Sequence, residues 1–430
     1  MKKIASLLAL LFCTCSISLF SQEEYLLLDT LDFANFQADT FSFSQDTSLL
    51  MPFFAKYESV ITNKSGNINI VQIGGSHIQA GTFSNRIRRN ILLQHTDLIA
   101  GRGMIFPYST AKRCNNPADY KVSKTREFSL IRNVYQNIEK PLGVTGIAVY
   151  TRDTITDITI KMNDKEIPYL SDLIYILGFS DTGNVVPSVW IDSVEYKPVE
   201  IDTAARRFIY KTAPFKDSFL IRIPCDSNLV FTLTGILLEN QNPGITFHSL
   251  GVNGASVESY LKCDYFVKDL ELLKPDMVIF GLGINDAADP DFDTLQFQKE
   301  YLLLIDRVKQ VNPNCAFVFV TNNDSFKRVS KGKYCVNNNG PLAWSVFYKL
   351  AAQTAGAVWD QFEIMGGLKS MDKWRIAGLA QKDRVHFTHT GYNLLGDLFY
   401  NAFIHAKNKC VLFETELLQK NNKIIINSRN

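Results

Sequence analysis

A serine, a histidine and an aspartate that together could perform acyl chemistry occur in two distant segments of the sequence. Ser76 lies in VQIGGSHIQAG (71–81), whereas Asp383 and His386 stand three residues apart in KDRVHFTHTGY. A serine hydroxyl is a weak nucleophile until an imidazole accepts its proton, and a carboxylate must fix the tautomer of that imidazole. Asp383 and His386 are close enough within one loop to form such a pair. A serine between a strand and a helix also serves as an N-cap, so Ser76 alone would not indicate catalysis.

Two further clusters supply hydrogen-bond donors. Gly254 lies in SLGVNGASV after the apolar run ITFHSL, and Asn285 and Asp286 follow the apolar run MVIFGLG. A glycine lets its backbone N–H approach a substrate closely, and an asparagine amide stabilises a developing oxyanion without being ionisable. In open parallel sheets, ligands bind beyond the carboxyl ends of the strands. We therefore expect Ser76 and these two clusters to converge at one edge of a sheet.

The elements that must position these residues follow an alternating pattern. The run NINIVQI (67–73) predicts a buried strand of the parallel kind, and the segment after Ser76 has helical spacing. After Gly244, apolar strands and amphipathic helices alternate again, which favours a three-layer α/β/α (flavodoxin-like) domain with a parallel sheet. Between these parts, residues 112–244 contain short alternating runs such as DITIKM and SFLIRI, separated by turn residues. This pattern of short alternating runs predicts an inserted antiparallel β-sandwich.

The four clusters, in this order, resemble the serine, glycine, Gly-x-Asn-Asp and Asp-x-x-His blocks of the SGNH/GDSL hydrolase family. The resemblance covers about residues 67–110 and 245–405 and implies a serine esterase without a cofactor or metal. It implies Ser76 as nucleophile, His386 as general base and Asp383 as its orienting carboxylate. The oxyanion hole would comprise the Ser76 and Gly254 backbone N–H groups and the Asn285 side chain.

One position departs from the family pattern, and two residues have competing interpretations. Gly75 stands where the family has an aspartate before the serine. That aspartate supports local structure, so its replacement bears on turnover and on whether the domain is active. Asp286 competes with Asp383 as the carboxylate of the triad, but Asp383 has the better spacing to a histidine. His77 is interpreted as a structural hydrogen-bonding residue.

The N-terminus predicts an extracytoplasmic location, periplasmic or secreted. Residues 1–21 have two lysines, an apolar run and then small residues, which is the pattern of a secretory signal peptide. Lys2 and Lys3 account for the whole formal charge of +2, so the remaining chain is neutral and offers no electrostatic case for nucleic acid. No later apolar stretch is long enough to span a membrane. The cysteines form no CxxC pair that would indicate a zinc or redox site.

The sequence thus divides into five parts: a signal peptide (1–21), a first part of the hydrolase domain (22–111), the inserted carbohydrate-binding-like sandwich (112–244), a second part of the hydrolase domain (245–411) and a C-terminal tail (412–430).

The inserted sandwich and the signal peptide suggest a polymeric glycan as substrate, because sandwiches often present an edge or a face to carbohydrate. The layout is similar to that of peptidoglycan O-acetyl esterases within the family, and peptidoglycan or another acetylated polysaccharide is the expected partner. Tyr108, Trp344, Trp359 and Trp374 are candidates for stacking on sugar rings, with burial as the alternative. Two other functions stay open. A transferase would hand the same acyl group to a sugar hydroxyl, and a glycan-binding protein would carry an inactive hydrolase domain.

Overall fold

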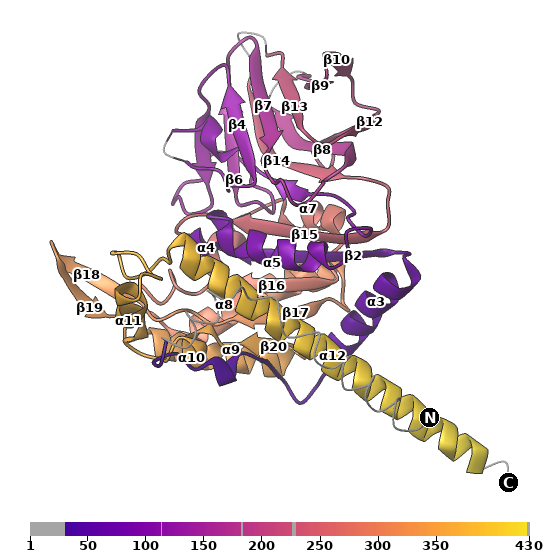
Figure 1. Ribbon diagram of the computed structural model, residues 1–430. Helices are drawn as coiled ribbons and strands as arrows, with labels where there is room; N and C mark the ends of the chain where they lie inside the picture. Colours follow the sequence, from indigo (N-terminus) through magenta and orange to yellow (C-terminus); the bar gives the residue numbers. More distant parts are fainter. Residues whose placement is uncertain (1–30, 113, 182–183, 226–228, 428–430) are drawn as a thin grey trace.

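The computed structural model describes residues 31–112, 114–181, 184–225 and 229–427, and side chains up to residue 412. Its centre is a six-stranded sheet of order β1-β20-β17-β16-β2-β15 (Figure 1). Neighbouring strands are parallel except for the edge pair β1 and β20, which is antiparallel. The strands are β1 (Phe41–Phe43), β2 (Asn67–Gly74), β15 (Gly244–Gly251), β16 (Met277–Gly281), β17 (Ala316–Val320) and β20 (Ala357–Trp359).

Helices cover both faces of this sheet. Successive residues of a strand point to opposite faces, and in β2 Ile68 and Ile70 join one hydrophobic cluster while Val71 and Ile73 join another. The first cluster contains side chains of α3 (Leu50–Asn63), α5 (Thr82–Leu93) and α12 (His389–Asn427). The second contains those of α6 (Val257–Leu261), α7 (Phe266–Leu273), α8 (Thr294–Val311) and α9 (Gly340–Thr354). The three-layer α/β/α prediction is confirmed.

Two antiparallel sheets form the module above the central sheet in Figure 1. The smaller has the order β10-β9-β13-β7-β4, and the larger β11-β12-β8-β14-β6-β5 with β3 paired to β14. Buried residues of both sheets belong to one cluster, as a sandwich requires. The strands are β3 (Gly103–Ile105), β4 (Tyr120–Lys124), β5 (Ser129–Arg132), β6 (Ile147–Thr151), β7 (Thr156–Met162), β8 (Ser171–Ser180), β9 (Ser188–Ile191), β10 (Val194–Tyr196), β11 (Glu200–Asp202), β12 (Arg207–Phe215), β13 (Ser218–Ile223) and β14 (Phe231–Glu239).

Some local elements differ from the sequence-based expectation. The helical segment after Ser76 is divided into α4 (Ser76–Gln79) and α5, because Gly81 between them has a φ of 78°. Pro117 occupies the space where a Cβ of residue 81 would lie, so a larger residue would not fit there. A hairpin of β18 (Phe326–Ser330) and β19 (Lys333–Val336) was not predicted, and forms a two-stranded sheet by itself. The remaining short helices are η1 (Phe36–Ala38), η2 (Tyr108–Thr110), α10 (Gln361–Ile364) and α11 (Ser370–Ile376).

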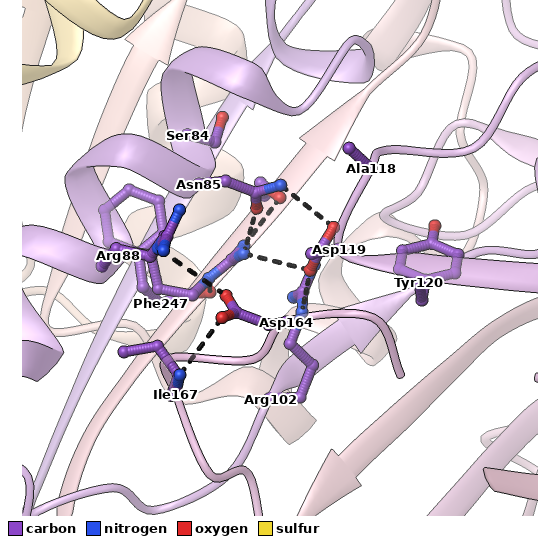
Figure 2. A network of polar contacts seen from close by, with 12 residues as sticks. Ser84, Asn85, Arg88, Arg102, Ala118, Asp119, Tyr120, Asp164, Ile167 and Phe247 are labelled. Carbon is purple, nitrogen blue, oxygen red and sulfur yellow. Dashed lines mark hydrogen bonds and ion pairs between the residues drawn. The ribbon is translucent and has the colours of Figure 1, made fainter. Parts of the chain in front are cut away.

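A buried ionic network joins the module to the helix that follows Ser76 (Figure 2). Asp119, just before β4, accepts hydrogen bonds from Arg102 Nε at 2.5 Å and from Asn85 Nδ2 of α5 at 3.0 Å. Arg88, also on α5, lies 3.5 Å from Asp119 and donates to Phe247 O of β15 at 3.0 Å. Buried charges are stable only when paired and hydrogen-bonded. The network therefore fixes α5 and the module in one arrangement.

The N-terminal signal peptide prediction (1–21) lies outside the described residues. Within the part of the chain that the structure describes, no helix is both long and apolar enough to cross a membrane.

Candidate active site

Ser76 lies where the central strand β2 passes into α4. The strand ends at Gly74, and Ser76 is the first residue of the helix, whose Ile78 and Gln79 N–H groups both bind the Gly75 carbonyl. Ser76 is not an N-cap, since the cap position belongs to Gly75 and no side chain caps this helix. The turn therefore leaves the Ser76 hydroxyl for other contacts.

The structure brings Ser76, His386 and Asp383 together although 310 residues separate the serine from the histidine. Ser76 Oγ lies 2.8 Å from His386 Nε2, and His386 Nδ1 lies 2.7 Å from Asp383 Oδ2. The carboxylate can only accept, so Nδ1 carries the imidazole hydrogen and Nε2 accepts from the serine hydroxyl. This is the arrangement of a serine–histidine–carboxylate triad.

The loop that carries the acid and the base is organised by the carboxylate itself. Asp383 Oδ1 accepts the N–H groups of Val385 at 2.9 Å and His386 at 3.0 Å. Burial by itself would raise the pKa of Asp383, but the hydrogen bonds from the His386 side chain and from these two N–H groups outweigh it and lower the pKa to about 2. Asp383 is consequently ionised near neutral pH. The side chains of His386 and Asp383 are 32% and 46% exposed, so water reaches the triad.

The three predicted oxyanion donors meet at the ends of β2, β15 and β16. Asn285 Nδ2 donates to Ala255 O at 2.9 Å, which orients the amide and leaves its second N–H for another acceptor. Gly254 has a φ of 82°, a conformation that favours glycine. Among the hydrogen bonds of the described residues, the N–H groups of Ser76 and Gly254 have no acceptor. These donors are therefore available to a developing negative charge.

Gly75 lies against the oxyanion donors. A Cβ at this position would be 3.1 Å from Asn285 Nδ2 and 3.4 Å from Ala255 O. The missing side chain thus gives the Asn285 amide the space that it occupies.

Contacts that no local sequence pattern indicates hold the nucleophile turn. Tyr260 donates through its hydroxyl to Gly74 O at 2.9 Å, and Asn253 N–H donates to Gln79 Oε1 at 2.7 Å. A candidate tyrosine, Tyr108, donates to Gly251 O at 2.9 Å. Together these bonds fix the glycine loop against α4.

His77 packs against His386 and Tyr392, which agrees with the structural role expected for it. Its Nδ1 lies 2.7 Å from the Tyr392 hydroxyl, and its ring centroid lies 5.1 Å from that of His386. Burial lowers the pKa of His77 to about 3, so this imidazole is neutral. A neutral ring at this place adds no positive charge beside the His386 imidazole.

Asp286 does not contact a histidine. Its Oδ1 accepts the Val257 N–H at 3.0 Å, at the start of α6. Burial raises its pKa to about 7. These contacts favour the structural interpretation of Asp286 and leave Asp383 as the carboxylate of the triad. Over the described chain, no group of three or more histidine, cysteine or acidic residues is arranged to hold a metal.

Three of the four aromatic candidates for sugar stacking are buried. Trp359 and Trp374 are 0% exposed and Tyr108 is 5% exposed, and only Trp344 is partly accessible. Trp359 donates to Asp39 and Trp374 to Met365 O, so both indole N–H groups are used inside the protein. For these three residues the stacking interpretation is wrong, because their rings pack in the core.

The fold and the site together define a serine hydrolase built on a three-layer α/β/α domain. Residues 232–394 match the model of the GDSL-like lipase/acylhydrolase family. The match includes Gly254, Asn285, Asp383 and His386 but not Ser76, which lies earlier in the chain. Over these residues the chain therefore carries a GDSL-like lipase/acylhydrolase domain, which marks the protein as an esterase.

Among the solved structures similar to this chain, the first described below supports the same fold. A peptidoglycan O-acetylesterase structure is similar with a TM-score of 0.70 and 20% identity, and covers 88% of this chain and 99% of its own. An acetyl xylan esterase, AlAXEase, matches with a TM-score of 0.29 and 18% identity over 37% of this chain and 81% of its own. A lipase/acylhydrolase from Enterococcus faecalis matches with a TM-score of 0.30 and 21% identity over 39% of this chain and 77% of its own. No curated protein matches the chain at a significant level.

Proposed function

We propose that the protein removes O-acetyl groups from a glycan, peptidoglycan or another polysaccharide, through an acetyl-serine intermediate. The observation that carries the proposal is the contact chain from Ser76 through His386 to Asp383, with contacts of 2.8 Å and 2.7 Å. His386 accepts the serine proton as Oγ attacks the acetyl carbonyl, and then returns this proton to the sugar oxygen that leaves. Water attacks the acetyl-serine in the second half of the reaction, and acetate is released.

The oxyanion donors stabilise both tetrahedral states. The Ser76 and Gly254 N–H groups and the free N–H of Asn285 are neutral dipoles already in place before reaction. Removal of one such donor typically costs about 3 kcal/mol of barrier. The exposure of the triad supports water as the acceptor, whereas a transferase needs to exclude water from its acyl-enzyme.

Support for the substrate class and the location comes from the chain as a whole. The chain enters the two-sheet module at β3, after α4 and α5, and the similar peptidoglycan O-acetylesterase structure covers 88% of the chain. The leader-like sequence of residues 1–21 supports an extracytoplasmic enzyme, periplasmic or secreted.

Acetate release by the wild type and by Ser76→Ala tests the proposal. Each protein is incubated with p-nitrophenyl acetate, O-acetylated peptidoglycan and O-acetylated xylan. We expect the wild type to release acetate from at least one glycan and Ser76→Ala to lose this activity at least about 10³-fold. Full activity in Ser76→Ala refutes the nucleophile. A folded wild type that releases acetate only when a sugar acceptor is added is a transferase, and one that binds glycan without any release is an inactive binding protein.

A further inference from the structure

The hairpin β18–β19 carries a concentrated positive charge beside the catalytic loop. Its sequence FKRVSKGKYCV (326–336) contains four basic residues and no acidic residue. We call Lys327, Arg328, Lys331 and Lys333 the basic hairpin. In the part of the chain that the structure describes, none of these four side chains forms an ion pair. Several surface lysines and arginines elsewhere on the chain, such as Lys56 and Arg222, have carboxylate partners, and the basic hairpin stands out because its four unpaired cations lie within one short segment, 327–333.

The hairpin is attached directly to the loop that carries Asp383 and His386. Phe326 N–H donates to Arg384 O at 3.1 Å, and the Arg384 guanidinium lies 5.2 Å from the Phe326 ring centroid and 4.7 Å from that of Tyr334. Asn323, just before the hairpin, donates to Val385 O at 3.1 Å. The base of the hairpin is thus held against both residues between the catalytic aspartate and histidine.

The rest of the hairpin extends away from the protein. It joins no other sheet, and Figure 1 shows it projecting at the edge of the molecule beside α11. Arg328, Val329, Ser330, Lys331 and Lys333 are exposed. The outer edges of both strands and the side chain of Val329, which is 67% exposed, are therefore accessible to a partner. The charge of the hairpin indicates an anionic partner.

A second side of the site, next to Gly254 and Asn285, is acidic. A cavity of about 380 Å³ lies beside Gly254 and Asn285. Its acidic lining residues are Glu258, Asp286, Asp289, Asp291, Asp293 and Glu300. Asn339, three residues after the end of β19, donates to Asp289 O at 2.8 Å, so the segment that follows the hairpin contacts the acidic loop. The catalytic edge therefore has a basic side and an acidic side.

We propose that the basic hairpin binds the carboxylates of short peptides attached to the glycan, so that the enzyme selects peptide-substituted peptidoglycan over neutral or purely uronic polysaccharides. The inference rests on the proposed function and specifies its substrate. A polyuronate offers only carboxylates and would be repelled by the acidic side. A peptide substituent with carboxylates and an amine complements both sides, and a neutral xylan complements neither.

A charge-neutralised variant tests the hairpin without touching the triad. The test variant is K327Q/R328Q/K331Q/K333Q, and the matched control removes the same charge from exposed lysines of the module with K121Q/K161Q/K211Q/K216Q. Both are made in the wild-type and the Ser76→Ala backgrounds. Binding by the Ser76→Ala proteins is measured by co-sedimentation with O-acetylated peptidoglycan sacculi and with immobilised O-acetylated xylan and alginate. This reading does not require catalysis, so it is independent of whether the proposed esterase activity is found.

At about 0.05 M salt, we expect the hairpin variant to bind sacculi at least about tenfold more weakly than the control variant. At about 0.5 M salt this difference should largely disappear, because salt screens exposed charges. In the wild-type background, kcat/KM on sacculi falls in parallel, and kcat/KM on p-nitrophenyl acetate stays within about twofold. Equal binding of sacculi by the hairpin and control variants overturns the proposal. So does an equal or stronger loss on alginate, which identifies a polyuronate as the partner of the hairpin.

Discussion

Exchanging a carboxylate for an amide tests whether Asp383 or Asp286 is the carboxylate of the triad. In Asp383→Asn the carbonyl oxygen keeps an acceptor for the N–H groups of Val385 and His386, which Asp383 Oδ1 binds at 2.9 Å and 3.0 Å. The amide NH₂ then faces His386 Nδ1, which lies 2.7 Å from the present carboxylate oxygen. Two donors cannot bond, so the imidazole must place its hydrogen on Nε2, the atom that accepts from Ser76. The loop is preserved and the base is lost.

The magnitude follows from the exposure of the pair. In a buried triad this exchange lowers kcat by about 10⁴. Asp383 is 46% exposed, and water near the loop screens the charge and competes for the imidazole N–H. We therefore expect a smaller loss of kcat/KM, about 10²–10³, which is about 2.7–4 kcal/mol of barrier.

The matched exchange Asp286→Asn is expected to cost less than about tenfold. Asp286 accepts one N–H, from Val257 at 3.0 Å, and an asparagine oxygen replaces that acceptor. Burial raises the pKa of Asp286 to about 7, so near neutral pH the carboxyl is already partly protonated and little charge is lost. The assay is kcat/KM on p-nitrophenyl acetate for both variants, with thermal unfolding to confirm that each is folded. A larger loss in Asp286→Asn than in Asp383→Asn would refute the assignment of the triad acid.

Two further predictions concern the oxyanion donor and the ionic network. Asn285→Ala should lower kcat about 10²–10³-fold with KM little changed, since the amide acts on charge that develops during reaction; a raised KM at unchanged kcat would contradict this role. Burial by itself would raise the pKa of Asp119, but the charges of Arg102 and Arg88 outweigh it and hold this pKa below the ordinary 3.8. A lowered folded pKa stabilises the fold above 3.8, and this stability is lost as the pH falls through the lowered value. Asp119→Asn should be about 3–5 kcal/mol less stable than the wild type at pH 7. In urea unfolding measured from pH 7 to pH 3, its free energy of unfolding should therefore fall less than that of the wild type. An equal fall in both proteins would count against this account.

The sequence predicts the site well where short-range patterns and sheet geometry suffice. Ser76, Gly254 and Asn285 each follow an apolar strand, and parallel strands place such residues at one edge. Asp383 and His386 are adjacent in one loop, so their pairing needs no long-range information. The contact between Ser76 and His386 could be expected only because the family resemblance joined two blocks 310 residues apart.

Other features depend on packing that residue types do not encode. Nothing in the local sequence indicates that Tyr392 would reach His77, or that Trp359 and Trp374 would be buried rather than exposed to a sugar. The hairpin escaped prediction for a related reason. Its strands are short, mostly exposed and rich in lysine, so they lack the alternation that identifies a half-buried strand. The sequence signal for a turn in this segment was Gly332, which has a φ of 75° in the structure.

The glycine that departs from the family pattern has a structural counterpart in the oxyanion site. An aspartate at position 75 would place its Cβ 3.1 Å from Asn285 Nδ2 and 3.4 Å from Ala255 O, closer than most such contacts in proteins. In this protein Asn285 is instead anchored by its own hydrogen bond to Ala255 O, at 2.9 Å. The support that a neighbouring aspartate side chain would give is thus supplied by a backbone carbonyl, and the amide uses the space that glycine leaves. Because the triad contacts are also formed, Gly75 is compatible with an active enzyme, and its presence does not favour an inactive binding domain.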